Sequence, residues 1–361
     1  MTKGCAARGE GAHIGLEVSD LFAQELFYRT ILGFSTLYRY ASRNTPGLRT
    51  VMLRRGNVDL ELLHRGKERL GGNAGAWGHA ALGVRDVDAE YERLRGLGLA
   101  GLVRPRDTGD GFRECSFCDP EGNRIELFAR VRPFTPPAIA AAIFDLDGTL
   151  VDSEPNYYEA DRRLLAAYGV TLTPAMKRRY VGVSNLAMAE DVRERFGIAE
   201  NAATLVERKM AIYRELARAD TPVFPEISAL VRALAGRGLP LAVASGSPAD
   251  VVATILGNTG LAEYFGVVVS ADEAGRPKPD PAVFTEAARR MGTEADRCVV
   301  FEDSAIGVEA ALRAGMRCVA IPTAPDAPLD PRFEMADILY ADGMPSSSAA
   351  SVLSRLDASS T

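Results

Sequence analysis

The spacing of hydrophobic and polar positions changes along the chain and predicts two structural regions. In the second region, short apolar runs alternate with stretches of helical spacing, which is the pattern of parallel strands covered by helices on both faces. Helices are expected at residues 157–168, 203–217 and 349–356. A doubly wound α/β domain is therefore predicted over residues 142–361. The apolar runs that predict its strands cover residues 138–144, 239–245, 265–270 and 298–303.

The first 130 residues contain an internal repeat with a different order of elements. The segment HIGLEVSD, which begins at His13, recurs 66 residues later as HAALGVRD, and DLELL recurs as RIELF. Residues 21–31 and 87–97 have helical spacing and follow aspartate-containing starts. Each half therefore reads strand, helix, then three strands. Two such βαβββ modules are expected to pair into a cup with approximate twofold symmetry over residues 1–131, which makes this an α+β domain.

The repeat supplies four candidate metal ligands. His13 and Glu61 belong to the first half, His79 and Glu126 belong to the second, and the whole chain has only three histidines. A single histidine on a strand is usually a core or surface residue, but four residues recurring in register favour a shared site. Two imidazoles and two carboxylates suit a divalent transition metal such as Zn, Ni, Co, Mn or Fe.

This arrangement, with FYRTILGF in the first half and DPEGNRIELF in the second, resembles the vicinal-oxygen-chelate superfamily. The superfamily includes glyoxalase I, metal-dependent epimerases, extradiol dioxygenases and drug-resistance proteins. The resemblance implies a metal that captures two adjacent substrate oxygens and a base that removes a proton from the neighbouring carbon. It implies Glu126 as that base, with Glu61 as the alternative. A homodimer through this domain is compatible with the repeat, because such halves can pair within one chain or across two.

Within this superfamily, the residues favour proton transfer on a hydroxy-ketone such as a keto-sugar or cyclitol. Glu17 stands where glyoxalase I members carry an arginine that holds glutathione, and an acid there would repel the carboxylates of that tripeptide. A fourth protein ligand argues against the two-His, one-carboxylate set of extradiol dioxygenases. An epimerase or isomerase is therefore favoured over a glyoxalase-like lyase or a dioxygenase. A binding or resistance domain without catalysis is the competing class.

Acidic and hydroxyl side chains follow the apolar runs of the second region. The first run leads into IFDLDGTL, which places Asp145 and Asp147 one residue apart. Two like charges at such positions repel each other unless a cation or a transferring group lies between them. The later runs end at Ser245, Glu302 and Asp303. In an open parallel sheet the ligand crevice lies at the carboxyl ends of the strands, so these groups are expected to meet there.

A lysine held between two prolines supplies positive charge for that site. Lys278 lies in RPKPDP, in a chain that has 37 Arg and only five Lys. A compact ammonium suits a point-charge contact to a phosphate or an aspartate better than the wider guanidinium does. A surface lysine in a turn is the competing interpretation.

The DxDGT motif, the first serine of ASGS, the lysine of RPKPDP and the acidic pair of FEDSAIG resemble the four motifs of the haloacid dehalogenase superfamily. The resemblance covers about residues 142–357. It implies a nucleophile, Asp145, that forms an aspartyl-phosphate, and an acid and then base, Asp147. It also implies that the phosphoryl group is held by Ser245, Lys278, Thr149 and Gly246. The Mg²⁺ ligands that it implies are Asp145, Asp147, Glu302 and Asp303.

The segment between the first two motifs looks like the helical cap of this family, over about residues 153–223. Such caps close over the site and select the substrate, which makes Tyr157, Asn185 and Lys209 candidates for specificity contacts. Related sugar-phosphate mutases carry a histidine where Tyr157 stands and an arginine where Asn185 stands. Without them a Mg²⁺-dependent phosphatase of a small phosphorylated metabolite, a sugar or cyclitol phosphate, is favoured, and a phosphosugar mutase is the alternative.

Composition narrows the class of partner. The net charge of −6 argues against nucleic-acid binding. Residues 1–15 have no apolar core of signal-peptide length and residues 138–144 are too few to span a membrane, which predicts a cytoplasmic protein without membrane partners. Five cysteines without disulfide spacing agree with a reducing compartment. Residues 132–141 read as a Pro-rich linker, so the chain is predicted to be a bifunctional enzyme that performs successive steps on related metabolites.

Overall fold

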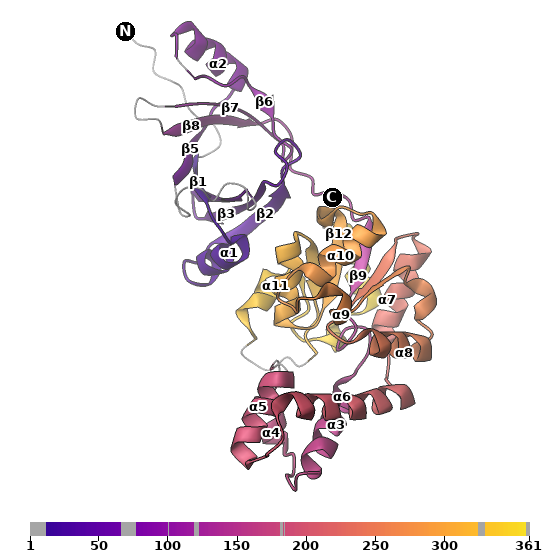
Figure 1. The fold of residues 1–361 in the computed structure, drawn as a ribbon. Helices are drawn as coiled ribbons and strands as arrows, with labels where there is room; N and C mark the ends of the chain where they lie inside the picture. Colours follow the sequence, from indigo (N-terminus) through magenta and orange to yellow (C-terminus); the bar gives the residue numbers. More distant parts are fainter. Residues whose placement is uncertain are drawn as a thin grey trace. The chain divides into compact units, whose positions relative to one another are not determined.

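The computed structural model describes residues 12–65, 77–99, 101–118, 123–180, 183, 185–323 and 329–358. Within them the chain divides after Pro137 into two compact units (Figure 1). Phe134, in the segment expected to be a linker, stacks on Tyr38 with ring centroids 4.7 Å apart. At the other end of that segment, the Ala140 backbone N–H donates to the Arg297 carbonyl at 2.8 Å. Each end of the expected linker therefore packs on its own unit.

The first unit consists of two βαβββ modules, as the repeat predicts. Residues 119–122, which begin the DPEGNRIELF segment, lie outside the described residues. The first module contains β1 (Ala12–Glu17), α1 (Leu21–Thr30), β2 (Ser35–Ala41), β3 (Arg49–Arg55) and β4 (Val58–His64). The second module contains β5 (Trp77–Gly83), α2 (Val87–Gly96), β6 (Arg106–Asp107), β7 (Phe112–Cys118) and β8 (Arg124–Arg130).

The two modules share one curled sheet in the order β2-β3-β4-β1-β5-β8-β7-β6. β1 runs parallel to β4 and antiparallel to β5, and β5 runs parallel to β8, so the four strands with the predicted ligands are contiguous. Helices α1 and α2 begin at the side-chain caps Asp20 and Asp86. They pack on apolar clusters around Leu62 and Leu127. The opposite face of the sheet remains available for polar side chains.

The second unit is a doubly wound parallel sheet with helices on both faces, as expected. The sheet order is β11-β10-β9-β12-β13-β14. Its strands are β9 (Ala141–Phe144), β10 (Leu241–Ala244), β11 (Val267–Val269), β12 (Cys298–Glu302), β13 (Arg317–Ala320) and β14 (Ile338–Leu339). The helices around it are α7 (Pro225–Gly236), α8 (Ala249–Thr259), α9 (Ala271–Ala274), α10 (Ala282–Met291), α11 (Ala305–Ala314) and α12 (Ala349–Ala358).

The central strands are buried on both faces. All four residues of β9 and of β10 are buried, and Phe144 stacks on Phe301 of β12 with ring centroids 4.4 Å apart. Burial on both faces explains why these strands read as continuous apolar runs. The polar residues that follow them therefore lie at the first positions where the chain leaves the core.

Four helices form a cap beside the sheet, seen at the bottom of Figure 1. They are α3 (Glu154–Ala166), α4 (Pro174–Arg179), α5 (Asn185–Phe196) and α6 (Ala202–Ala219). The cap has its own apolar cluster around Leu165, Val192 and Leu205. Its longest helix, α6, also reaches the sheet domain, where Arg214 pairs with Asp250 of α8 (Nε–Oδ2 3.0 Å).

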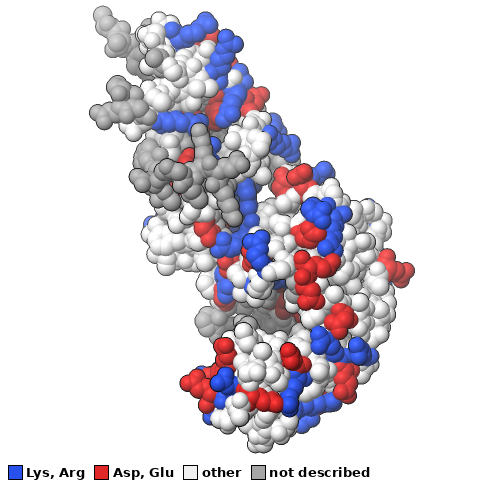
Figure 2. Space-filling model, in the orientation of Figure 1, with Lys and Arg blue, Asp and Glu red and all other residues white. Residues whose placement is uncertain are grey.

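Charged side chains of both signs are interspersed on the face of the second unit drawn in Figure 2. Ion pairs within one helix of this unit include Arg163 with Glu159 at 2.8 Å and Arg290 with Glu286 at 2.7 Å. The face drawn in Figure 2 therefore has no continuous basic stripe, which is consistent with the negative net charge of the chain. In the described ranges, the helices are all too short or too polar to cross a membrane.

Candidate active site and candidate metal pocket

The sheet of the second unit brings the predicted phosphoryl-transfer residues together. The Asp145 N–H donates to the Phe301 carbonyl at 3.0 Å, which extends the β9–β12 ladder by one residue. The Ser245 N–H similarly donates to the Val269 carbonyl at 3.0 Å, and Glu302 is the last residue of β12. The parallel ladder itself thus fixes these residues at the carboxyl ends of neighbouring strands.

Lys278 connects two of the carboxylates. Its Nζ lies 2.5 Å from Asp145 Oδ1 and 2.5 Å from Glu302 Oε1, and it also donates to the Ala244 carbonyl at 3.4 Å. Burial and the neighbouring carboxylates raise the pKa of Asp145, while the Lys278 ammonium lowers it. The pKa of Lys278 is raised despite its burial, because Asp145 and Glu302 stabilise its charge. The lysine is therefore a fixed cation beside the candidate nucleophile.

Three carboxylates form a candidate cation site. Oxygens of Asp145, Glu302 and Asp303 all lie within 4.8 Å of one another. Burial raises the pKa of Asp303 to about 7, and Glu302 adds to this effect. Gly148, at φ +81°, follows the DxD pair, and a Cβ there would run into the Asp303 carboxylate. A cluster of hard oxygen donors whose charges oppose one another fits Mg²⁺.

The carboxylate of Asp147, which was predicted among the metal ligands, lies outside this group of three. Its Oδ1 accepts a hydrogen bond from Tyr213 Oη at 2.9 Å, and its Oδ2 accepts one from Ser247 Oγ at 2.6 Å. Both oxygens are thus held by hydroxyl groups.

The remaining predicted phosphate contacts surround the same turn. Thr149 is fully buried, and its Oγ1 has no hydrogen-bond partner among the described residues. Ser245 is also fully buried and its Oγ accepts from the Ser247 N–H at 3.0 Å, whereas Gly246 is exposed. A buried hydroxyl without a partner beside the DxD turn is consistent with a ligand group completing its hydrogen bonding.

The cap candidates differ in their relation to this site. The Tyr157 ring stacks on Tyr213 at 4.0 Å, and its hydroxyl lies 3.5 Å from Ser247 Oγ. Lys209 Nζ lies 5.6 Å from the centre of the Tyr157 ring and 2.5 Å from Asp161 Oδ1. Tyr157 therefore reaches the site directly, and Lys209 is held beside Tyr157.

Asn185 is the first residue of another cap helix, α5. Its Nδ2 lies 3.7 Å from Met210 Sδ, so its contact is with the residue next to Lys209 on α6. Asn185 is half-buried, and the contact found among the described residues joins α5 to α6.

Sequence reasoning missed three residues of the second unit: Ser247, Tyr213 and Asp161. Ser247 could have been found, because it is the second serine of ASGS, two residues after Ser245. Tyr213 lies on the buried face of an amphipathic helix, and nothing in the spacing separates it from a core residue. Asp161 occurs in a charged helical stretch that reads as a solvated face.

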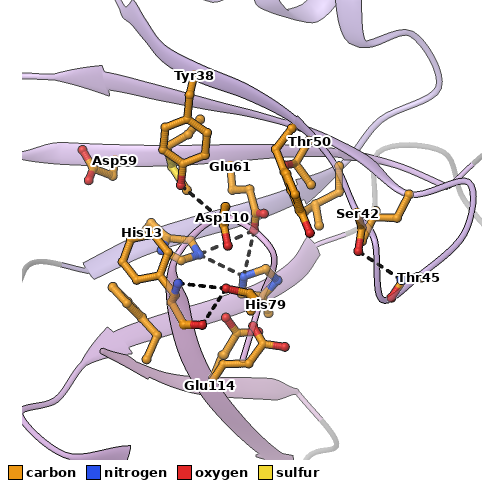
Figure 3. A pocket seen from close by; sticks show the side chains of 18 of the residues that line it. His13, Tyr38, Ser42, Thr45, Thr50, Asp59, Glu61, His79, Asp110 and Glu114 are labelled. Atoms are coloured by element: carbon orange, nitrogen blue, oxygen red, sulfur yellow. Dashed lines mark hydrogen bonds and ion pairs between the residues drawn. The ribbon is translucent and has the colours of Figure 1, made fainter. Parts of the chain in front are cut away.

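The first unit contains a cavity of about 530 Å³ on the inner face of its sheet (Figure 3). His13, Glu61 and His79 point toward one another in it. Glu61 Oε2 lies 3.5 Å from His13 Nε2 and 3.3 Å from His79 Nε2, and the two histidine nitrogens are 3.1 Å apart. Burial opposes ionisation of Glu61, but hydrogen bonds from His13 and His79 outweigh it and lower its pKa to about 2.

The backbone leaves room for this cluster at one glycine. A Cβ at Gly15, on β1, would overlap the ring of His79 on the neighbouring β5. The His79 side chain is buried, so its ring has little freedom to move away. Gly15 is therefore needed for the observed place of one candidate ligand.

Glu126 lines the same cavity but lies outside the group of three, in contrast to the predicted set of four ligands. Its Oε2 lies 3.1 Å from Arg124 on the same strand. Burial and the nearby carboxylate of Glu114 raise the pKa of Glu126 to about 9. The Glu126 side chain therefore interacts with Arg124 and Glu114, neither of which was predicted from the sequence, and is not a member of the histidine cluster.

The rest of the cavity lining combines polar with apolar side chains. Tyr38 Oη donates to Asp110 Oδ2 at 3.2 Å, and both groups point into the cavity (Figure 3). Burial, with the charge of Asp110, raises the pKa of Tyr38, so this phenol stays neutral. Further hydroxyl and amide groups come from Tyr40, Ser42, Asn44, Thr45, Thr50 and Thr108. Such a lining suits a ligand with many hydroxyl groups.

The two sites define a chain that combines an acid-rich site on a parallel sheet with a histidine–carboxylate pocket in paired βαβββ modules. A family model for haloacid dehalogenase-like hydrolases matches residues 139–315. A model for the Glyoxalase/Bleomycin resistance protein/Dioxygenase superfamily matches residues 12–127. The chain belongs to the haloacid dehalogenase-like hydrolases through its second unit, and its first unit contains a glyoxalase-type domain.

Curated relatives match the second unit. Hexitol phosphatase B of Escherichia coli (strain K12) is 33% identical over 210 residues, which are 56% of this chain and 92% of that protein. Fructose-1-phosphate phosphatase YqaB of the same strain is 33% identical over 182 residues, 50% of this chain and 96% of its own. Validoxylamine A 7′-phosphate phosphatase of Streptomyces hygroscopicus subsp. limoneus is 32% identical over 205 residues, 56% and 92% respectively.

Solved structures agree on the fold of this unit. CbbY from Rhodobacter sphaeroides in complex with phosphate is 25% identical with a TM-score of 0.51, over 61% of this chain and 99% of that chain. β-Phosphoglucomutase from Clostridium difficile, at 21% identity and a TM-score of 0.50, covers 61% of this chain and 98% of its own, and shows the fold alone.

Proposed function

We propose that the second unit is a phosphatase that hydrolyses the phosphate ester of a sugar, polyol or cyclitol through an aspartyl-phosphate. The observation that carries this proposal is the position of Asp145, buried at the end of β9 with Lys278 2.5 Å away and Asp147 two residues further on. A carboxylate nucleophile, a fixed cation and a second carboxylate are the groups that phosphoryl transfer to a side chain requires.

In the proposed reaction, an Asp145 oxygen attacks phosphorus, and the bond between phosphorus and the ester oxygen breaks. Asp147 gives its proton to that oxygen, so the alcohol leaves neutral. Asp147 then takes a proton from water as the water oxygen attacks the phosphorus of the acyl phosphate. Phosphate leaves and both aspartates return to their starting states. Lys278 and Ser245, with Thr149 and the Gly246 backbone, would hold the phosphoryl oxygens.

Asp145, Glu302 and Asp303 fit a Mg²⁺ ion by their hard oxygen donors and by the mutual repulsion of their charges. When bound there, Mg²⁺ supplies positive charge that offsets the charge of the phosphoryl oxygens. Lys278 neutralises part of the same carboxylate charge in its absence, because it pairs with both Asp145 and Glu302.

The relatives support the substrate class. Their names specify phosphatases of hexitol phosphates, of fructose 1-phosphate and of validoxylamine A 7′-phosphate. Tyr157 favours a phosphatase over a phosphosugar mutase: its phenol, whose pKa is raised by burial, is a poor second proton carrier beside Asp147. Tyr157, Asn185 and Lys209 are the proposed specificity residues of the cap.

The test is phosphate release from a panel of hexitol, ketose and cyclitol phosphates with Mg²⁺. We expect a subset of these esters to be hydrolysed and Asp145→Asn to abolish release. Asp342→Asn, at an exposed aspartate in the same unit, is the matched control and should retain activity. Equal release by the wild type and Asp145→Asn would contradict the proposal.

We infer that the first unit transfers a proton on a hydroxy-ketone with the help of a divalent transition metal. His13, Glu61 and His79 would hold the metal, which would polarise two adjacent substrate oxygens when bound. Glu126 is the proposed base, because it lines the cavity outside the ligand cluster and therefore has no metal to compete for its oxygens. The hydroxyl-rich lining favours a keto-sugar or cyclitol and an epimerase reaction.

A second candidate, an extradiol-type dioxygenase, is favoured by one observation: the described cluster is a two-His, one-carboxylate set. Oxygen consumption with catechols separates it from proton transfer, which is followed by exchange of solvent deuterium into a hydroxy-ketone. We expect Glu126→Gln to keep the metal and lose exchange, and Glu61→Gln to lose both. Metal binding without exchange on any offered ketone would support a small-molecule-binding domain instead.

Fusion of the two units supports successive steps on one carbon skeleton. A phosphorylated keto-sugar or cyclitol offers adjacent oxygens to one site and a phosphate ester to the other. Product of the first unit should then be a substrate of the second, or the reverse, which chromatography of a coupled assay would establish. Two substrate panels without a common skeleton would exclude this link.

A further inference from the structure

Helix α6 carries two inward-facing side chains one turn apart. Lys209 and Tyr213 are four residues apart, so they lie on the same face of the helix. Lys209 lies beside the Tyr157 ring, and Tyr213 contacts Asp147. The end of α6 beyond Tyr213 is tied to α8, by the Arg214–Asp250 pair at 3.0 Å and by a hydrogen bond from Asn258 Nδ2 to the α6 backbone at 3.0 Å. The position of Tyr213 is therefore fixed relative to the sheet domain.

The environment of Tyr213 restrains its hydroxyl. The side chain is fully buried and stacks on Tyr157 with ring planes 20° apart. Its Oη donates to Asp147 Oδ1 at 2.9 Å. The pKa of Tyr213 is raised by burial, so the group remains a neutral hydroxyl. The packed Tyr213 ring thus holds its hydroxyl group against one carboxylate oxygen of Asp147.

The second oxygen of Asp147 is held in the same way by Ser247 Oγ, at 2.6 Å. Hydroxyl groups suit a residue that alternates between two protonation states. A hydroxyl donates to a carboxyl oxygen without adding charge, whereas an ammonium or guanidinium would favour the ionised form and oppose its protonation. Contacts from two hydroxyls can therefore hold the Asp147 carboxyl in one orientation throughout a proton cycle.

We propose that Tyr213 is a positioning residue that, with Ser247, fixes the Asp147 carboxyl so that its proton is aimed at the leaving oxygen. This inference rests on the proposed phosphatase function. It assigns a role to a buried cap tyrosine whose hydroxyl contacts Asp147, a residue outside the group of three metal-site carboxylates.

The experiment compares two leaving groups in Tyr213→Phe. An alkyl phosphate, such as a hexitol phosphate, needs a proton on its leaving oxygen, whereas p-nitrophenyl phosphate releases a stable anion and needs none. The value of kcat/KM reports the first phosphoryl transfer and so isolates this step. We expect kcat/KM to fall by about 10-fold or more for the alkyl phosphate and to change by about twofold or less for p-nitrophenyl phosphate.

Tyr180→Phe is the matched control, because Tyr180 Oη donates to Asp191 Oδ2 at 2.6 Å within the cap. It removes a similar tyrosine–aspartate hydrogen bond and should leave kcat/KM unchanged for both substrates. Ser247→Ala should reproduce the leaving-group dependence, and it tests the same idea if Tyr213→Phe lowers the unfolding temperature. An equal loss on both substrates, or none on either, would overturn the positioning role. Failure of wild-type hydrolysis would instead overturn the phosphatase proposal itself.

Discussion

Helix α11 passes so close to Glu302 that a Cβ on Gly307 would occupy the place of the Glu302 carboxyl group. Glu302 is fully buried, and its Oε2 accepts from the Ser304 N–H at 3.1 Å and from Ser304 Oγ at 2.9 Å. Its Oε1 lies against Lys278. The Glu302 side chain therefore cannot move away from an added Cβ without breaking these contacts.

Gly307→Ala should consequently destabilise the second unit and disturb the Lys278–Glu302 pair. Overpacking a tight interior typically costs about 1–3 kcal/mol. We expect a loss of unfolding free energy in that range, measured by urea denaturation, together with a lower kcat for phosphate release. Gly257→Ala in α8 is the control, because a Cβ there meets open space and alanine favours the helix. Unchanged stability in Gly307→Ala would show that Glu302 can move.

The sequence predicted the ladder of the second unit because its strands are continuous apolar runs that end in chemistry-bearing residues. Asp145, Ser245 and Glu302 are placed by the ends of β9, β10 and β12, which composition marks clearly. Tyr213 could not be found in this way. Its role depends on a contact between a cap helix and the DxD turn, 66 residues apart, and its own helix shows only an amphipathic stripe.

In the metal pocket, too, the sequence predicted the positions of residues on the strands but not all of their side-chain contacts. The repeat predicted that His13, Glu61, His79 and Glu126 face one interior, and all four line the cavity. It could not predict that Glu126 pairs with Arg124. The repeat fixes the positions of residues on the strands but does not determine which neighbouring group each side chain contacts. A set of four ligands in the sequence thus becomes a set of three and a separate carboxyl in the structure.

Gly15→Ala should weaken metal binding in the first unit. The new methyl group would overlap the His79 ring and force it away from His13 and Glu61. Groups that orient a ligand typically contribute about 10–100-fold to metal affinity, and we expect a loss of that size by calorimetric titration with Zn²⁺ or Ni²⁺. Gly96→Ala, which meets open space, should bind normally. Phosphate release by the second unit should be unchanged in both variants.

The stability of the metal-free second unit should fall as pH rises. Burial raises the pKa of Asp303 from 3.8 to about 7, so the folded state binds more protons than the unfolded state between those values. Unfolding free energy then decreases with increasing pH across that window. We expect the melting temperature in EDTA to drop between about pH 4 and pH 7, and excess Mg²⁺ to reduce the drop, since the ion compensates the carboxylate charge.

Asp303→Asn serves as the control for this titration, because it removes the ionisable group while keeping the shape of the side chain. Its melting temperature in EDTA should depend less on pH than that of the wild type. Equal slopes for the two proteins would assign the pH dependence to other groups.

Asp161 in the cap should contribute more to the free energy of unfolding than the surface ion pairs near it. Its side chain is 1% exposed and lies between two lysines, 2.5 Å from Lys209 and 3.1 Å from Lys177. Asp161→Asn would leave the buried Lys209 ammonium without a carboxylate, while Lys177 would keep its pair with Glu154 at 3.0 Å. Removal of one member of a buried ion pair typically costs about 3–5 kcal/mol. We expect a loss of this size in urea unfolding at neutral pH. Glu159→Gln, which removes solvent-exposed pairs with Arg162 and Arg163 on the same helix, should cost less than about 1 kcal/mol.

The sign of the pH dependence distinguishes this mechanism from a simple packing defect. Burial lowers the pKa of Lys209, and Asp161 is the first group that opposes this. In Asp161→Asn the folded state should therefore release a lysine proton that the unfolded state keeps, and the unfolding free energy should recover as pH rises toward the ordinary lysine pKa of 10.5. A deficit that stays constant with pH would mean that lost packing, rather than an uncompensated charge, destabilises the cap.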